Sequence, residues 1–168
     1  TYVYKDMLLV CLDNYKGEEK VDTSWLEDEL KRNQDKKVLV FGHEPAFKIF
    51  HEDCLDDNVQ NRNDFWEMLR RYNISTYFCG HDHFLDVAEV SGIYQICAGT
   101  GGGWLMEKYS NYNGDNGDYI PKRLIHKSSY GYMVIECINN QISVSWKSLD
   151  YTDNDYAISE IKLIEYSY

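Results

Sequence analysis

The 168-residue sequence predicts an α/β fold in which parallel strands come first and antiparallel hairpins follow. In its first half, short apolar runs alternate with two amphipathic segments, which is the rhythm of strand–helix–strand units. In its second half, pairs of apolar runs surround Ser91-Gly92 and Asn139-Asn140, which are dipeptides typical of hairpin turns. Apolar residues make up 43% and aromatic residues 15% of the chain, so a sizeable core is expected.

The first half is expected to contain three strands and two helices. The strands are short apolar runs bounded by polar residues, at 6–13, 37–42 and 74–79. A helix over 22–33 begins with capping candidates and acidic residues. A second helix over 63–72 has apolar side chains at i, i+3, i+4 and i+7, with Asn63 or Asp64 as its expected cap. The polar connection 44–62 is long, which predicts a functional loop.

The second half is expected to be built from hairpins. Its strands are predicted at 85–90, 93–98, 130–138, 142–147 and 158–166. The segment 107–129 is rich in Tyr, Asn, Asp and Gly and is predicted to be a long loop, and 150–155 a polar connection. A glycine-rich run, Gly99–Gly103, follows the second of these strands and could present backbone N–H groups to phosphate, although it lacks the Gly-Lys-Ser/Thr of a P-loop.

Composition excludes several classes of function. The net charge of −11 disfavours binding to nucleic-acid backbone and to anionic membrane surfaces. The longest apolar run is far shorter than the roughly 20 residues of a transmembrane helix, so no membrane span is expected. Five cysteines, without a CxxC pair, are expected to be ordinary core thiols rather than a disulfide framework.

Two apolar runs end at Gly-His, and these segments carry most of the functional information. The run at 37–42 leads to His43, and the run at 74–79 leads through Gly80 to His81 and His83. Parallel strands end side by side, α/β proteins bind ligands at that edge, and imidazole is the commonest metal ligand. We therefore expect a metal site there. In an extended segment the rings of His81 and His83 would project to the same side and could serve two ions roughly 3.5–4 Å apart, and the glycines would allow a sharp turn or a positive φ.

Other residues are weaker candidates. Carboxylates near the histidines are expected to orient them or to face solvent: Glu44, Asp82 and Asp86. Two further histidines fall in polar segments, where they could contact substrate but are expected to be solvated: His51 and His126. Aromatic residues that either rim a pocket or pack over the core are Trp104, Tyr109, Tyr112 and Tyr119. A small basic cluster, expected to be solvated, consists of Lys122, Arg123 and Lys127.

The motifs resemble the C-terminal half of a calcineurin-like metallophosphoesterase. The relevant segments are FGHEPAF followed by a helix, then YFCGHDH, a hairpin and YQICAGTGGG. The purple acid phosphatase branch is similar too, because Val40-Phe41-Gly42-His43 fits its Val-x-x-His and Gly80-His81-Asp82-His83 fits its Gly-His-x-His. LLVCLDNY and SWLEDEL also resemble segments that follow the Gly-Asn-His motif of that superfamily, and the similarity extends to about Trp146.

The resemblance implies that residues 1–168 are the C-terminal portion of a single domain, an αββα sandwich. It also implies two divalent or trivalent metal ions (Fe, Mn or Zn) and hydrolysis of phosphomonoesters or phosphodiesters by a hydroxide bound to both metals. Carried over residue by residue, His43 and His81 would bind one metal and His83 the other.

The chain departs from the family pattern in one respect. The Asp-x-His, Gly-Asp-x-x-Asp and Gly-Asn-His motifs have no counterpart in it. Three imidazoles cannot fill two coordination spheres, because even structural zinc usually takes four ligands. We therefore expect this chain to supply only histidine ligands, to be inactive alone, and to need a missing N-terminal half or a complementary chain. The alternatives are a non-catalytic metal-binding or interaction module that retains a half-site, and a hydrolase with a single zinc on three histidines.

Overall fold

The computed structural model describes residues 1–14, 19–107, 111–112, 114–152 and 155–168, with only the backbone of 151, 152, 155 and 156. In the described residues the first half contains β1 (Tyr2–Tyr4), β2 (Met7–Cys11), α1 (Thr23–Arg32), β3 (Lys37–Phe41), a 3₁₀ turn (Leu55–Asn58), α2 (Val59–Arg71) and β4 (Thr76–Cys79). The second half contains β5 (Leu85–Val90), β6 (Ile93–Ala98), β7 (Lys122–Lys127), β8 (Gly131–Ile138), β9 (Gln141–Thr152) and β10 (Asp155–Ser167).

The strands form two sheets. The larger has the order β1-β2-β3-β4-β6-β5-β7, and the smaller has the order β10-β9-β8. Neighbours among β2, β3, β4 and β6 pair in parallel, whereas the other neighbouring pairs are antiparallel. The predicted α/β fold, with a parallel and mixed sheet first and antiparallel hairpins after it, is confirmed.

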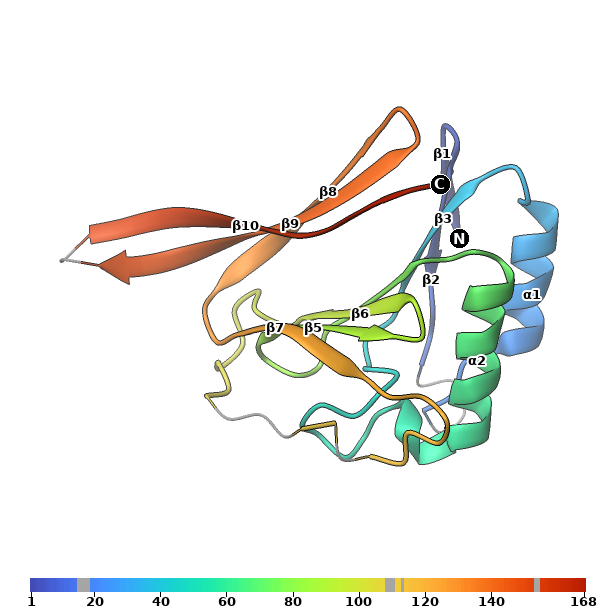
Figure 1. The fold of residues 1–168 in the computed structure, drawn as a ribbon, viewed down its shortest axis with the longest axis horizontal. Helices are drawn as coiled ribbons and strands as arrows, with labels where there is room; N and C mark the ends of the chain where they lie inside the picture. The colour runs from blue at the N-terminus through green and yellow to red at the C-terminus, as the bar shows by residue number, and fades with distance from the viewer. Residues whose placement is uncertain (15–18, 108–110, 113, 153–154) are drawn as a thin grey trace.

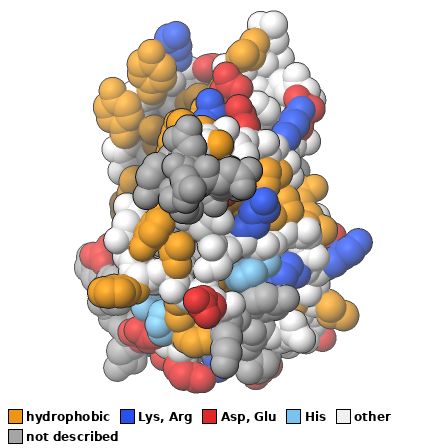
Figure 2. Space-filling model, turned by 90° about the vertical axis from the view of Figure 1, so that its left-hand side faces the viewer, with side chains coloured by type: hydrophobic (Ala, Val, Ile, Leu, Met, Phe, Trp, Pro, Cys, Tyr) orange, Lys and Arg blue, Asp and Glu red, His pale blue; other side chains and the backbone are white. Residues whose placement is uncertain are grey.

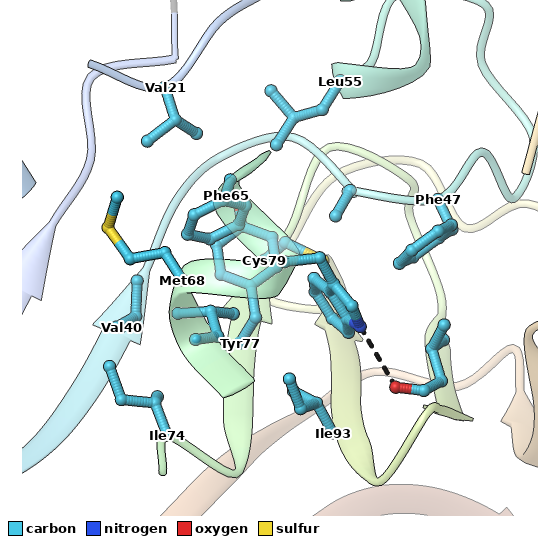
Figure 3. Close-up of a cluster of buried hydrophobic side chains, with 14 of the residues drawn as sticks. Val21, Val40, Phe47, Leu55, Phe65, Met68, Ile74, Tyr77, Cys79 and Ile93 are labelled. Carbon is cyan, nitrogen blue, oxygen red and sulfur yellow. Dashed lines mark hydrogen bonds between the residues drawn. The ribbon is translucent and has the colours of Figure 1, made fainter. Parts of the chain in front are cut away.

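The elements are arranged in layers, with α1 and α2 on one side of the larger sheet and the smaller sheet on the other (Figure 1). One buried cluster joins the helices to the larger sheet and includes Leu26, Phe65 and Tyr77 (Figure 3). A second buried cluster lies between the sheets and includes Phe78 and Trp146. Among the described residues both helices cover the same face, so the second helical layer of an αββα sandwich is not seen in them.

Helix α2 begins earlier than the sequence indicated. Its N-cap is Asn58, without a side-chain capping bond, so the prediction of Asn63 or Asp64 as the cap was wrong. The reason is Arg62, a charged residue inside the first turns that is fully buried, which hides the apolar periodicity there. Helix α1 begins as predicted, because the Asp22 side chain accepts a hydrogen bond of 3.0 Å from the Trp25 N–H.

The second half is more extended than predicted. The segment 107–129, predicted to be a loop, contains β7, and the predicted polar connection 150–155 is largely strand. Polar residues are tolerated in both places because β7 is an edge strand and β9–β10 projects from the body as a two-stranded arm (Figure 1). Both predicted turns are confirmed: Ser91, Gly92, Asn139 and Asn140 all have positive φ, as hairpins of this kind need.

The cysteines are all thiols, as predicted, although only part of the set is in the core. Cys54, Cys79 and Cys97 are buried, Cys137 is half-buried and Cys11 is exposed. Burial raises the pKa of the Cys54 thiol to about 12. Within the described residues, no helix is both long and apolar enough to cross a bilayer.

Candidate functional site

The candidate site lies where β3 and β4 end. These strands are parallel, with Phe41 opposite Phe78, so both chains leave the sheet at the same edge. The ladder continues past them, since Gly42 N donates to Phe78 O at 2.9 Å and Gly80 N donates to His43 O at 2.8 Å. The rings of His43 and His81 consequently meet, with 3.3 Å between His43 Nε2 and His81 Nδ1. The predicted association of these two histidines is thus present.

The glycines before the histidines do not have the positive φ that the sequence analysis allowed for, and only one of them is needed for close packing. A Cβ on Gly42 would lie 2.1 Å from the Tyr77 hydroxyl and 2.6 Å from Asn14 Oδ1, so close approach requires glycine there. A Cβ on Gly80 would meet nothing closer than 3.9 Å. The positive φ falls instead on His81, at 65°, a left-handed conformation that non-glycine residues adopt mainly in turns.

The segment that carries His81 and His83 is tightly turned rather than extended. Asp82 N donates to Gly80 O at 2.7 Å, and Phe84 N donates to Asp82 O at 2.8 Å. The expectation that both rings project to the same side of an extended segment was therefore wrong. The ring of His81 contacts His43, while the ring of His83 donates from Nδ1 to the Trp104 carbonyl at 2.8 Å.

His83 is held by the glycine-rich segment. A Cβ on Gly103 would lie 2.7–3.0 Å from three atoms of the His83 ring, so only glycine allows this contact. A carbonyl oxygen can only accept, so Nδ1 of His83 carries the proton and, in the neutral ring, Nε2 carries the lone pair. A backbone carbonyl that fixes the tautomer in this way is the usual support of a metal-binding histidine.

His81 has an acidic partner that the sequence did not indicate. Its Nε2 lies 3.1 Å from Asp53 Oδ1, a carboxylate supplied by the long connection 44–62. Burial acts to raise the pKa of Asp53, but the hydrogen bond from His81 and one from the backbone outweigh it, so the net pKa is lowered. Ionised Asp53 can only accept, so Nε2 of His81 carries the proton that is donated to it. In the neutral ring of His81 the lone pair is therefore at Nδ1, the atom that faces His43.

The backbone at His43 is fixed by Asn14. The Asn14 side-chain oxygen accepts from His43 N at 2.7 Å and from Glu44 N at 3.2 Å, and the residue is buried. Burial, followed by the nearness of His81 and then His83, lowers the pKa of His43 and favours the neutral, ligating ring. Asn14 lies 29 positions from His43 in the sequence, and its only signal was an amide directly after an apolar strand.

Asp82 is buried and positions His51 rather than a metal. Its Oδ1 lies 2.6 Å from His51 Nδ1, and its two oxygens also accept from the backbone N–H groups of Phe50 and His51 at 3.2 Å. The ring of His51 lies against that of His81, with centroids 4.6 Å apart. The expectation of a merely solvated His51 was wrong, because the connection 44–62 folds back over the site.

The remaining candidates form a separate structural network. Buried Asp86 bonds to Arg123 Nε at 2.6 Å, to His126 Nδ1 at 2.9 Å and to the Tyr112 hydroxyl. His126 and Arg123 are therefore not simply solvated, whereas Lys122 and Lys127 are exposed as expected. Tyr112 and Tyr119 pack over the core, Glu44 is fully buried, and Tyr109 lies outside the described residues.

The imidazole pair fits a transition-metal ion. Two nitrogens bound to a tetrahedral zinc, each about 2.0–2.1 Å away, lie about 3.3–3.4 Å apart, and the observed separation is 3.3 Å. The donor chemistry also fits, because both facing atoms are imidazole nitrogens, which suit transition-metal ions. In the described part of the chain, however, no three His, Cys, Asp or Glu side chains are grouped to hold an ion by themselves.

Comparisons with known proteins find similarity to one family of hydrolases over the first half of the chain. Residues 5–85 match the family model described as calcineurin-like phosphoesterase. Over 89 residues the chain is 30% identical to tartrate-resistant acid phosphatase type 5 of Rattus norvegicus, and over 86 residues it is 29% identical to that of Homo sapiens. The alignments cover 51% and 49% of this chain and 25% of each relative, so the chain spans about a quarter of their length.

Two solved structures share its fold. A purple acid phosphatase, PPD1 of yellow lupin (Lupinus luteus), superposes with a TM-score of 0.59 at 13% identity, over 92% of this chain and 30% of that chain. GAP50, the anchor in the inner membrane complex of Plasmodium, superposes with a TM-score of 0.55 at 20% identity, over 84% of this chain and 42% of that chain. The predicted resemblance to the calcineurin-like phosphoesterases is confirmed by the family model over residues 5–85 and by these acid phosphatases.

Proposed function

We propose that this chain is the C-terminal portion of a two-metal phosphoesterase domain and supplies three of its metal ligands. His43 and His81 would hold one ion and His83 the other. The observation that carries the proposal is the meeting of His43 Nε2 and His81 Nδ1 at 3.3 Å, at the exits of two parallel strands. When bound, such ions would lower the pKa of water towards ~7 and offset charge on the phosphoryl oxygens.

The chain's own residues prepare these ligands. Asp53 and the Trp104 carbonyl fix the proton positions of His81 and His83, so that each neutral ring presents a defined lone pair. Asp82 accepts from Nδ1 of His51, so a protonated His51 ring would donate from Nε2 to an oxygen of a phosphate ester beside His81. His51 would thus orient substrate without being a ligand.

The remaining ligands would come from a missing N-terminal half of the domain or from a complementary chain. The structure offers a place for such a segment. A groove of about 460 Å³ opens between β1–β3 and β8, and apolar side chains line it, including Met7, Leu39, Phe41 and Ile135. The groove lies against β2, β3 and β8, so an apolar segment of the missing part would fit it.

Reconstitution tests this function. The chain would be mixed with a polypeptide that carries the Asp-x-His, Gly-Asp-x-x-Asp and Gly-Asn-His motifs, together with Mn, Fe or Zn, and hydrolysis of an aryl phosphate would be followed. We expect activity from the mixture and little from either part alone. His81→Ala with His83→Ala should abolish it, while His126→Ala, outside the site, serves as the matched control. Full activity in the double variant would refute the assignment.

The second candidate is a non-catalytic metal-binding or interaction module that retains a half-site. The observation in its favour is that no complete ligand group occurs in the described residues. Calorimetric titration of the isolated chain with Zn²⁺ separates the two proposals. Tight binding of one ion per chain would favour the self-contained module. Weak binding, as expected when only two histidines hold an ion, would favour a site that other residues complete.

A further inference from the structure

A second cavity lies beside the candidate site and is not used by the proposed chemistry. It is a groove of about 510 Å³ where β8 begins, between the glycine-rich segment and the β9–β10 arm. Thr100, Gly101 and Gly102 form one wall, and Tyr132, Leu149 and Ile158 belong to the other. We call this cavity the arm groove.

The outer wall of the arm groove is an exposed apolar strip. Leu149 is opposite Ile158 and Tyr132 is opposite Lys147 in the antiparallel register, so these side chains share one face of the small sheet. Leu149, Ile158 and Tyr132 are 48%, 69% and 57% exposed, although each could bury apolar surface if the groove were filled. Figure 2, the view onto the left-hand side of Figure 1, shows exposed hydrophobic side chains and, lower on the same side of the molecule, histidines.

The charge at the rim favours a neutral organic group rather than an anion. Lys147 lies 3.6 Å from Glu160, and the Ser148 hydroxyl bonds to Ser159 at 2.6 Å and to Asp150 at 3.1 Å. Each of these polar groups is satisfied by another, so the exposed apolar strip and the tyrosine ring are what a ligand would meet.

The glycine-rich segment connects the arm groove to the candidate metal ligands. Thr100 fixes the start of this segment. Its hydroxyl donates to Gly131 O at 3.0 Å, and its backbone carbonyl accepts from Gly131 N at 3.3 Å. Gly101 and Gly102 line the groove, Gly103 packs against the His83 ring, and the Trp104 carbonyl accepts from His83. The Trp104 side chain is 91% exposed although its backbone is anchored at the site. The five-residue segment 100–104 therefore has His83 at one end and the groove at the other.

We propose that the arm groove binds the organic part of the substrate, and that this part is a neutral aromatic group, as in an aryl phosphate ester. The proposal rests on the proposed function for its link to phosphate, but binding of the aromatic group alone does not. Tyr132, Leu149 and Ile158 contact the ring, and the segment 100–104 leads from the groove to His83. The phosphoryl group then reaches the histidines while the alcohol remains in the groove.

The first experiment detects the groove without metal or phosphate. The ¹⁵N-labelled chain is titrated with 4-methylumbelliferone, and amide shifts are followed by NMR. We expect saturable shifts at Tyr132, Leu149 and Ile158. Leu149→Ser and Ile158→Ser should each weaken binding about 5–10-fold, which corresponds to burial of a partly exposed aliphatic side chain. Both side chains are exposed, so the variants should fold, and circular dichroism checks this.

Ile138→Ser is the matched control, because Ile138 is an exposed isoleucine of β8 that does not line the arm groove. Its affinity for 4-methylumbelliferone should be that of the unchanged protein. Equal weakening by Ile138→Ser, or the absence of saturable shifts at the groove, would overturn the proposal and indicate only adherence to apolar surface.

The second experiment separates the groove from the catalytic proposal. In the reconstituted enzyme, the ratio of kcat/KM for 4-methylumbelliferyl phosphate to that for glycerol phosphate should fall about 5–10-fold in Leu149→Ser, mainly through KM. An unchanged ratio would overturn the link to substrate. If no phosphate ester is hydrolysed but 4-methylumbelliferone still binds, the proposed function fails while the groove as an aromatic-binding site stands.

Discussion

Arg62 is a fully buried charged residue with partners in three segments, and its replacement gives the sharpest stability prediction. The side chain is fully buried on α2 and pairs with the carboxylate of Asp56. It also donates to Asp115 O at 2.7 Å and lies 4.4 Å from the centre of the Phe47 ring. Arg62 thus joins α2 to the connection over the site and to the segment before β7.

Arg62→Met keeps much of the buried volume but leaves Asp56 as a buried carboxylate without its cation. Loss of one partner of a buried pair is expected to lower the free energy of unfolding by about 3–5 kcal/mol at pH 7. With a urea slope of about 2 kcal/mol/M for a domain of this size, the midpoint should move by about 2 M. Arg70→Met is the matched control. That residue is also on α2 and pairs with Glu67 at 2.5 Å, but it is exposed, so about 0–1 kcal/mol is expected.

The loss of unfolding free energy in Arg62→Met should also depend on pH. Burial raises the pKa of Asp56, and the Arg62 guanidinium opposes that rise, so removal of the guanidinium raises the pKa further. A folded-state pKa above the unfolded value means that protonation favours the folded state, so the loss should shrink as pH falls from 7 towards 4. Urea unfolding at both pH values measures this. Equal losses in Arg62→Met and Arg70→Met at pH 7 would refute the reasoning.

Two further predictions concern the sheet edge and the core thiols. Gly42→Ala should lower the free energy of unfolding by about 1–3 kcal/mol, because its Cβ would lie 2.1 Å from a tyrosine oxygen, whereas Gly80→Ala, with nothing nearer than 3.9 Å, should change it by under about 1 kcal/mol. Urea unfolding compares them, and similar effects would contradict the geometry. Cys11, which is exposed, should react with iodoacetamide at pH 8 long before Cys54, whose pKa is raised to about 12 by burial. Mass spectrometry of timed samples gives the order, and early labelling of Cys54 would contradict its burial.

Much of the fold was predictable because periodicity and turn residues act locally. The strands at 85–90 and 93–98 have the predicted bounds, and Asn139-Asn140 forms the predicted turn. Predictions failed where tertiary contacts outweighed local preference. The first turn of α2 was missed because the buried residue there is Arg62, not an apolar one. The polar segment 122–127 is a strand, β7, because it pairs with β5.

The sequence predicted the histidines of the candidate site but not the residues that hydrogen-bond to them. His43, His81 and His83 follow directly from Gly-His at strand ends, and the structure brings His43 and His81 together. Asn14 and Asp53 could not be identified, because each reaches the site through a connection whose path depends on the whole fold. The tautomer of His83 likewise depends on a backbone carbonyl, which no side-chain pattern encodes.

The central claim is that His43 and His81 bind the same metal ion. The direct measurement is a titration of the ¹⁵N-histidine-labelled chain with Zn²⁺, in which long-range ¹H–¹⁵N spectra report the state of each ring nitrogen. The account predicts that Nε2 of His43 and Nδ1 of His81 shift together, at the same Zn²⁺ concentration, while His126 stays unchanged. Independent shifts of His43 and His81, or a first response at His126, would contradict it.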